Sequence, residues 1–179
     1  LHPAEIQNLA KNFQELAKQE QLGGGRPAGR GKRVIVDRND GFAALKAVLP
    51  PPGRRAVVLI DPPYENKMDY QKVVESMADA MKRFPTGTYL IWYPVLQRHE
   101  SQRFAERLKK TVNQEWLNVT LSIGSQTPDG FGLVSSGMFV VNPPWKLAEE
   151  LKETMPYLVS VLQKDSGAAY LLETGTGKS

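Results

Sequence analysis

The stretch AVVLIDPPYENK, residues 56–67, joins an apolar run to an acidic residue, two prolines and an aromatic residue. Its β-branched residues predict a strand over 55–61. Asp61 therefore lies at the carboxyl end of a strand, which is where ligands bind in an open α/β sheet. Pro62 and Pro63 fix φ and remove two backbone donors, so the turn is stiff and its carbonyls remain free to accept hydrogen bonds. The stretch indicates a ligand site at a strand end.

Strand and helix patterns alternate on both sides of this stretch. Apolar residues at helical spacing predict helices over 3–19, 41–50, 69–84, 98–112 and 146–164. Apolar, β-branched runs predict strands over 33–40, 55–61, 87–95, 116–124, 132–142 and 167–173. This alternation is typical of an α/β fold, and the two consecutive strands late in the chain predict an antiparallel hairpin on one edge. We expect one domain with a mostly parallel sheet and an antiparallel edge hairpin.

The composition excludes several kinds of site. The 179-residue chain has no cysteine, which excludes disulfides, cysteine-bound metals and thiol catalysis. It has two histidines, and His99 lies in the polar stretch RHESQ, which predicts a solvent-facing side chain. We expect no metal site. The apolar runs are shorter than the roughly 20 residues that cross a membrane, and the first residues do not resemble a signal peptide. A cytoplasmic protein is expected.

The excess positive charge is concentrated in one glycine-rich segment, GGGRPAGRGKR, residues 23–33. It holds four of the 23 basic residues and no acidic residue, which leaves 19 basic against 19 acidic residues elsewhere. A flexible glycine-rich loop is easily accommodated on a surface. Two interpretations follow: a solvated insertion, or an arm that holds phosphates without reading base sequence.

The residues after the strand at 55–61 suit chemistry at an aromatic amine. The Asp61 carboxylate and a nearby carbonyl can accept both hydrogens of such an amine. Tyr64 can stack on the ring that carries it, so adenine and cytosine are the candidate substrates. A base inside a duplex would first be swung out. The pattern Asp/Asn/Ser-Pro-Pro-aromatic resembles the signature of amino-group methyltransferases that use S-adenosylmethionine. The alternative is an ordinary Pro-Pro turn.

The pattern occurs again in NPPW, residues 142–145. Asn142 follows the second strand of the expected hairpin, and an antiparallel strand ends at the opposite rim of the sheet from its neighbours. We interpret NPPW as a rigid turn that starts the last helix, with Trp145 in the core. The C-terminal TGTGKS resembles a phosphate-binding loop, but Leu172 stands where the full pattern needs a glycine.

A second candidate site is NDGF, residues 39–42. It follows the strand expected at 33–40 and precedes a helix. Asp40 could accept a hydrogen bond from the adenine amine of a cofactor, and the Gly41 N–H lies at a helix start, where donors are unpaired. Alternatively, Asp40 caps the helix that begins near Phe42. The residues alone leave both interpretations open.

In these motifs the chain resembles the RlmJ family, the bacterial large-subunit ribosomal RNA adenine-N(6) methyltransferases. Four stretches carry the resemblance: LHP (1–3), DGFAALKAVLPPPGRRAVVLIDPPYENKMDYQKVV (40–74), KRFPTGTYLIWYPV (82–95) and SSGMFVVNPPWKL (135–147). In that family a glycine-rich cofactor loop precedes the LHP stretch. The resemblance therefore implies that residues 1–179 are the C-terminal part of a Rossmann-like S-adenosylmethionine-dependent methyltransferase domain that lacks its first strands.

The resemblance also implies a reaction and its residues. S-adenosylmethionine would be the methyl donor, and the amine of one adenine in large-subunit rRNA the acceptor. Asp61 would be catalytic and contact the cofactor, Pro62, Pro63 and Tyr64 would frame the adenine, and Asp40 and Gly41 would contact the cofactor. Two alternatives remain: a DNA amino-methyltransferase with the same pocket, and a non-catalytic nucleic-acid-binding fragment that works through segment 23–33. A monomer is favoured.

Overall fold

The computed structural model describes residues 3–22, 34–126 and 132–177. The basic segment 23–33 lies outside the described residues, so neither interpretation of it is tested. The chain divides into two compact units, Leu1–Ala44 and Leu45–Ser179. The larger unit contains the sheet and the DPPY stretch.

In the smaller unit the structure describes helix α1 (Pro3–Leu22), residues 34–40 and the start of helix α2 (Gly41–Val48). α1 confirms the helix expected at 3–19. The strand expected at 33–40 is wrong, because residues 34–40 form no strand and no described residue pairs with them. Ile35 is 79% exposed, so this apolar run is not buried as a central strand would be. A strand exists only through its hydrogen-bonded neighbours, which a local pattern does not report.

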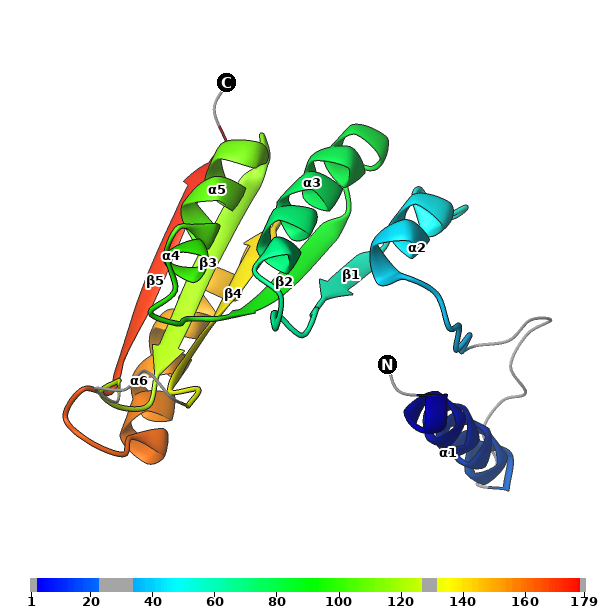
Figure 1. The fold of residues 1–179 in the computed structure, drawn as a ribbon, viewed down its shortest axis with the longest axis horizontal. Coiled ribbons are helices and arrows are strands. Elements are labelled where there is room, and N and C mark those ends of the chain that lie inside the picture. The colour runs from blue at the N-terminus through cyan, green and yellow to red at the C-terminus, as the bar shows by residue number, and fades with distance from the viewer. Residues whose placement is uncertain (1–2, 23–33, 127–131, 178–179) are drawn as a thin grey trace. The chain divides into compact units, whose positions relative to one another are not determined.

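The larger unit is built on a five-stranded sheet in the order β1-β2-β4-β3-β5 (Figure 1). The strands are β1 (Val57–Ile60), β2 (Thr88–Pro94), β3 (Glu115–Ser122), β4 (Ser135–Val141) and β5 (Ala169–Thr176). Only β1 and β2 pair in parallel, and the other three pairs are antiparallel. The α/β class is confirmed, but the mostly parallel sheet is wrong for the described chain, which has a mixed sheet.

The β3–β4 hairpin is confirmed, but its expected place at the edge is wrong. β4 lies between β2 and β3, and β5 pairs with the outer side of β3.

The last strand, β5, extends to Thr176. Gly175 of the TGTGKS stretch therefore belongs to a strand rather than to a phosphate-binding loop. Gly175 allows this pairing, because a Cβ there would lie 2.5 Å from the Trp116 ring of β3.

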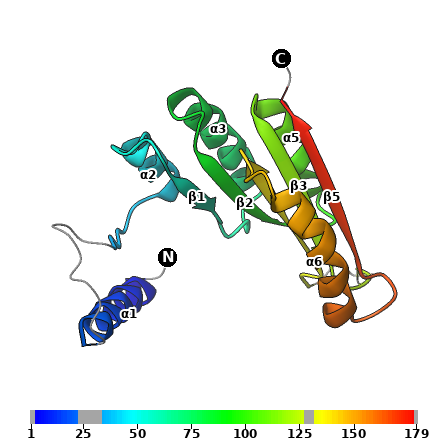
Figure 2. The same ribbon diagram turned by 180° about the vertical axis from the view of Figure 1, so that it is seen from behind.

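Helices cover both faces of the sheet. α3 (Met68–Arg83) and α5 (Phe104–Thr111) lie on one face, and α6 (Leu147–Leu162) lies on the other, where it packs on β3 and β5 (Figures 1 and 2). The single helix expected at 98–112 is divided at Arg103 into α4 (His99–Gln102) and α5. His99 is exposed, as predicted. No described helix is long and apolar enough to cross a membrane.

The core lies between the sheet and the pair α3 and α5. Tyr89, Ile91 and Tyr93 alternate along β2 on this side of the sheet, and all three are buried. The helices contribute Tyr70, Val73 and Met77 from α3, and Phe104 and Leu108 from α5, all with 0% exposure. Two of these aromatic rings, those of Tyr70 and Phe104, contact Tyr64 in the turn after β1.

Candidate active site at the end of β1

Asp61 lies where the sequence placed it, directly after the last residue of β1. Ile60 pairs with Ile91 of β2, so β2 runs on for three more residues beside the turn that starts at Asp61. Asp61 is exposed, and no described residue donates a hydrogen bond to its carboxylate. A carboxylate held at a strand end with free lone pairs can accept hydrogen bonds from a ligand.

The two prolines lead into a residue with a left-handed backbone. Pro62 is half-buried and Pro63 is exposed, and Tyr64 follows with φ of 53°. A positive φ is costly for a tyrosine, so surrounding contacts must hold this conformation. The Tyr64 hydroxyl donates a 2.7 Å hydrogen bond to the carbonyl of Trp92 on β2. This bond ties the turn after β1 to the neighbouring strand.

The ring of Tyr64 is 2% exposed. Its centroid lies 4.7 Å from that of Tyr70 in α3 and 5.9 Å from that of Phe104 in α5. Burial, with smaller contributions from Tyr70 and the charge of Asp61, raises the pKa of Tyr64 well above its usual value. The phenol therefore stays protonated and remains a donor to Trp92. In this conformation the ring supports the turn from the core side and has no free face for a base.

The supporting residues Tyr70 and Phe104 were not identified from the sequence. Tyr70 lies in the first turn of α3, and its ring meets Phe104 at 5.2 Å in an edge-on contact. Phe104 begins α5 and also meets Tyr93 of β2 at 5.3 Å. These residues come from three separate elements, and no local pattern signals that their rings converge under one turn.

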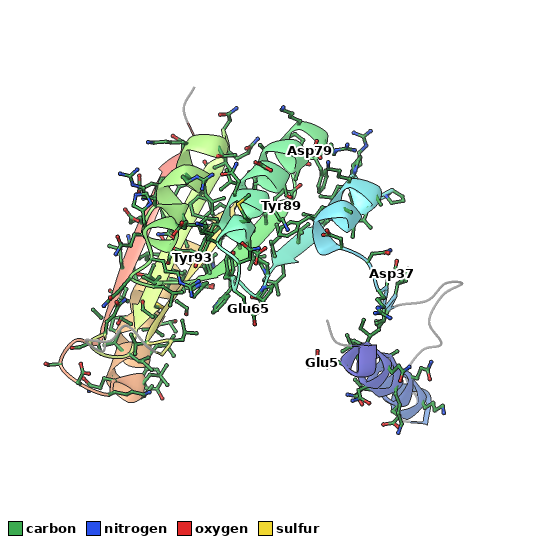
Figure 3. The ribbon with its side chains drawn as sticks, in the orientation of Figure 1. Glu5, Asp37, Glu65, Asp79, Tyr89 and Tyr93 are labelled. Carbon is green, nitrogen blue, oxygen red and sulfur yellow. The ribbon has the colours of Figure 1, made fainter. Side chains whose placement is uncertain are left out.

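The end of β2 is held by a chain of hydrogen bonds that crosses the sheet. The Tyr93 hydroxyl donates to Asn118 of β3 at 2.8 Å, and the Asn118 amide donates to Glu173 of β5 at 3.2 Å. Lys109 of α5 donates to Glu173 at 3.0 Å. Figure 3 shows Tyr93 among the side chains between the sheet and α5. The chain fixes the strand whose Trp92 carbonyl receives the Tyr64 hydroxyl.

This arrangement depends on Gly137 of β4, which lies between Tyr93 and Asn118. A Cβ at Gly137 would lie 2.3 Å from the Tyr93 ring, a separation that real Cβ atoms do not show. Glycine therefore allows Tyr93 to pass over β4 and reach β3.

A second set of hydrogen bonds fixes the chain just after β2. Ser101 donates to the Pro94 carbonyl at 2.7 Å and accepts from the Leu96 N–H at 2.9 Å.

Asp40 has the geometry of a helix cap. Its carboxylate accepts from the Phe42 N–H at 2.9 Å, and its carbonyl accepts from the Ala44 N–H at 2.9 Å. The capping interpretation is confirmed. Asp40 is exposed and uses one carboxylate oxygen for the cap, and an added Cβ at Gly41 would meet nothing within 4 Å. The structure places these two residues at the start of α2, whereas Asp61 belongs to the larger unit.

NPPW lies at the opposite rim of the sheet, as predicted. β4 is antiparallel to β2, and Val141, its last residue, pairs with Tyr89 near the start of β2. The Asn142 amide donates to the carbonyls of Pro85 and Gly87, and the turn leads into α6. The expectation that Trp145 packs in the core is wrong, because Trp145 is 83% exposed.

The described residues contain no group of three or more His, Cys, Asp or Glu side chains that could hold a metal ion.

Comparison with known proteins gives consistent results. The family described as "Ribosomal RNA large subunit methyltransferase D, RlmJ" matches residues 26–172. The chain is 39% identical over 173 residues to the "Ribosomal RNA large subunit methyltransferase J" of Haemophilus influenzae, covering 97% of this chain and 56% of that protein. It is 40% identical over 162 residues to the protein of the same name from Escherichia coli, covering 90% of this chain and 52% of that protein.

A solved structure is also similar. The crystal structure of a Legionella pneumophila protein superposes with a TM-score of 0.79 and 26% identity, covering 98% of this chain and 58% of that chain. The chain thus spans a little over half the length of the relatives that it matches.

Proposed function

Because the chain belongs to the RlmJ family of large-subunit ribosomal RNA methyltransferases, we propose that it carries the catalytic residues of such an enzyme. The substrate is large-subunit rRNA, and the acceptor is the exocyclic amine of an adenine. The observation that supports this most directly is the exposed Asp61 carboxylate on a turn fixed by Tyr64. An rRNA substrate agrees with the cytoplasmic location expected from the sequence.

Asp61 is proposed to act by accepting a hydrogen bond from the adenine amine. A carbonyl of the Pro62–Pro63 turn is proposed to accept the second, since proline leaves its carbonyl free. Two acceptors on one amine orient its nitrogen, and a positioned nucleophile reacts far faster than a free one. Stiffness of the turn is therefore useful in itself, because it holds the acceptors ready before the base arrives.

Pro62, Pro63 and Tyr64 are proposed to frame the adenine in two ways. Pro63 is exposed and offers an apolar surface beside Asp61. Tyr64 holds the turn through its hydroxyl and its buried ring. Direct stacking of Tyr64 on the base would require the ring to leave its contacts with Tyr70 and Phe104.

The family implies S-adenosylmethionine as cofactor, and the residues present fit its chemistry. Its sulfonium cation supplies an electrophilic methyl group. The exposed carboxylate of Asp61 is the right charge to lie near that cation. Asp40 has one carboxylate oxygen not used by the helix cap, and Gly41 leaves room for a ligand at the start of α2. We propose these two residues as cofactor contacts.

The proposal is tested by transfer of a tritiated methyl group from S-adenosylmethionine to unmethylated large-subunit rRNA. Both the 179-residue chain and the intact natural protein are assayed, with duplex DNA as a second substrate. We expect transfer to rRNA, and we expect Asp61→Ala to reduce it by at least about 100-fold, the lower range for a positioned catalytic group.

Glu65→Ala is the matched control, since Glu65 is an exposed carboxylate in the same loop that forms no hydrogen bond or ion pair with a described residue. It should retain transfer. No transfer to rRNA by the intact natural protein would contradict the proposal. Transfer to DNA alone would assign the site to a DNA amino-methyltransferase.

A further inference from the structure

The exposed Trp145 is not explained by the proposed reaction. It is 83% exposed at the rim opposite to Asp61, where a large aromatic ring loses the benefit of burial. Its position is nevertheless well fixed. Pro143 and Pro144 precede it, and Asn142 anchors the turn through two hydrogen bonds of 2.8 and 2.7 Å to the loop before β2. Tryptophan is enriched at interfaces, so an exposed tryptophan on an anchored turn suits a binding surface.

The loops around Trp145 are basic. Segments 53–56, 82–88 and 142–146 meet at this rim, because Thr88 donates from its N–H to the Ala56 carbonyl and from its hydroxyl to the Asn142 carbonyl. The three segments contain no acidic residue and five basic ones, all exposed: Arg54, Arg55, Lys82, Arg83 and Lys146. Arg83 forms an ion pair with Asp79, and no described carboxylate pairs with the other four.

The aromatic ring lies beside one of these charges. The Lys146 ammonium lies 4.6 Å from the centroid of the Trp145 ring. An aromatic ring beside cations is the combination that binds single-stranded nucleic acid, since bases stack on the ring and phosphates meet the cations. A protein partner for this surface would have to be acidic as well as apolar, whereas a single RNA strand supplies both features.

We propose that the surface formed by Trp145, Lys146, Arg54 and Arg55 binds an unpaired segment of the RNA substrate, with one base stacked on Trp145. This inference rests on the proposed function, because RNA is the polyanion that the reaction requires. The surface does not take part in the reaction. The five residue steps along β1 from Ala56, in the basic loops, to Asp61 place the two about 17 Å apart at 3.3 Å per residue.

Figure 3 labels one residue toward each rim, Glu65 and Asp79. Glu65 follows Asp61 in the same loop, and Asp79, in the last turns of α3, pairs with Arg83 of the basic loops. A ligand that reaches both rims is longer than about 15 Å, which excludes a mononucleotide and fits a structured RNA. The RNA would be held at one rim of the sheet and modified at the other.

The test measures RNA binding without cofactor, so that it does not depend on methyl transfer. Fluorescence anisotropy with a labelled 20-nucleotide oligouridylate gives the dissociation constant over a range of salt concentrations, in both the 179-residue chain and the intact natural protein. We expect Trp145→Ala to weaken binding about five-fold or more, the effect of losing one stacked base. The slope of log K against log salt should stay unchanged.

The charge variants should act differently. Arg55→Gln and Lys146→Gln should each lower that slope by about 0.7, the value for one phosphate contact on a single strand. Trp145→Phe should restore most of the affinity lost in Trp145→Ala. Two matched controls on α6, Tyr157→Ala and Lys152→Gln, replace exposed side chains of the same kinds and should change neither quantity.

Unchanged affinity in Trp145→Ala would overturn the inference. Loss of concentration-dependent self-association in that variant, with RNA affinity intact, would assign the surface to a protein contact and also overturn it. The proposed function fails separately. Asp61→Ala should lower methyl transfer by at least about 100-fold and keep RNA affinity. If the unaltered protein transfers no methyl group but its RNA binding still depends on Trp145, the proposed reaction is contradicted and the RNA surface stands.

Discussion

Three buried tyrosines direct their hydroxyls to fixed acceptors around β2. Tyr64 donates to the Trp92 carbonyl, Tyr89 donates to the Phe84 carbonyl at 2.8 Å, and Tyr93 donates to Asn118. Burial raises the pKa of Tyr89 to about 12 and that of Tyr93 to about 12, and it raises the pKa of Tyr64 further. Each phenol therefore stays neutral in the folded protein at pH values where it ionises in the unfolded chain.

This difference predicts loss of stability in alkaline solution. The folded-state pKa exceeds the unfolded value near 10, so the contribution of each tyrosine is complete below pH 10 and is lost as the pH rises toward 12. The free energy of unfolding should fall by up to about 1.4 kcal/mol per pH unit for each tyrosine in that window. Urea denaturation between pH 9 and 11.5 measures it. Tyr89→Phe should give a shallower fall, and an equal fall in that variant would contradict the assignment.

At the scale of strands and helices, the junction of β2, β4 and β3 is the tightest constraint near the candidate site. Gly137 leaves the space through which Tyr93 crosses β4. The crossing joins the strand beside Asp61 to the outer strands and to α5. A glycine inside a strand normally weakens the sheet, and here the tyrosine that lies over it supplies the missing packing.

Gly137→Ala should therefore destabilise the protein by about 1–3 kcal/mol, the usual range for overpacking a core. Urea denaturation of the single variants and of the double variant with Tyr93→Ala measures the coupling. The alanine should cost much less once the ring is gone, because the two residues compete for the same space. Equal costs in both backgrounds would show that the ring does not occupy that space.

The sequence predicted those features that depend on local pattern. The strand before Asp61 and the opposite rim for NPPW are confirmed, because β-branched runs and strand direction can be inferred from neighbouring residues. The strand at 33–40 and the buried Trp145 were wrong, because burial and pairing depend on distant residues. The contact of Phe104 with Tyr64 also depends on residues that are distant in the sequence, and it was not predicted.

At the scale of the larger unit, the described sheet ends in two edge strands, β1 and β5. β1 pairs with β2 along one edge, and no described strand pairs with its other edge. Val57 and Leu59 are 73% and 65% exposed, whereas Ile60 is 7% exposed. An exposed apolar edge strand is prone to pair with another chain.

We therefore expect the 179-residue chain to associate weakly at high concentration through β1, which would correct the monomer favoured from the sequence. Leu59→Lys should reduce this association with little change in stability, because the residue it replaces is exposed. Sedimentation velocity over a 100-fold range of concentration measures the effect. Lys substitution of Leu171, which is 52% exposed on β5, is the matched control. Equal association in the two variants would exclude β1 as the contact.

The two double-proline motifs also differ in chirality of the backbone. The left-handed residue is Tyr64, after the prolines, in one motif, and Asn142, before the prolines, in the other, with φ of 53° and 52°. The final aromatic side chains also differ in burial: Tyr64 lies in the core, and Trp145 is exposed to solvent. Two similar four-residue motifs thus adopt different backbone conformations. A sequence search for this signature would find both kinds. The position of the residue with positive φ, last in DPPY and first in NPPW, distinguishes them.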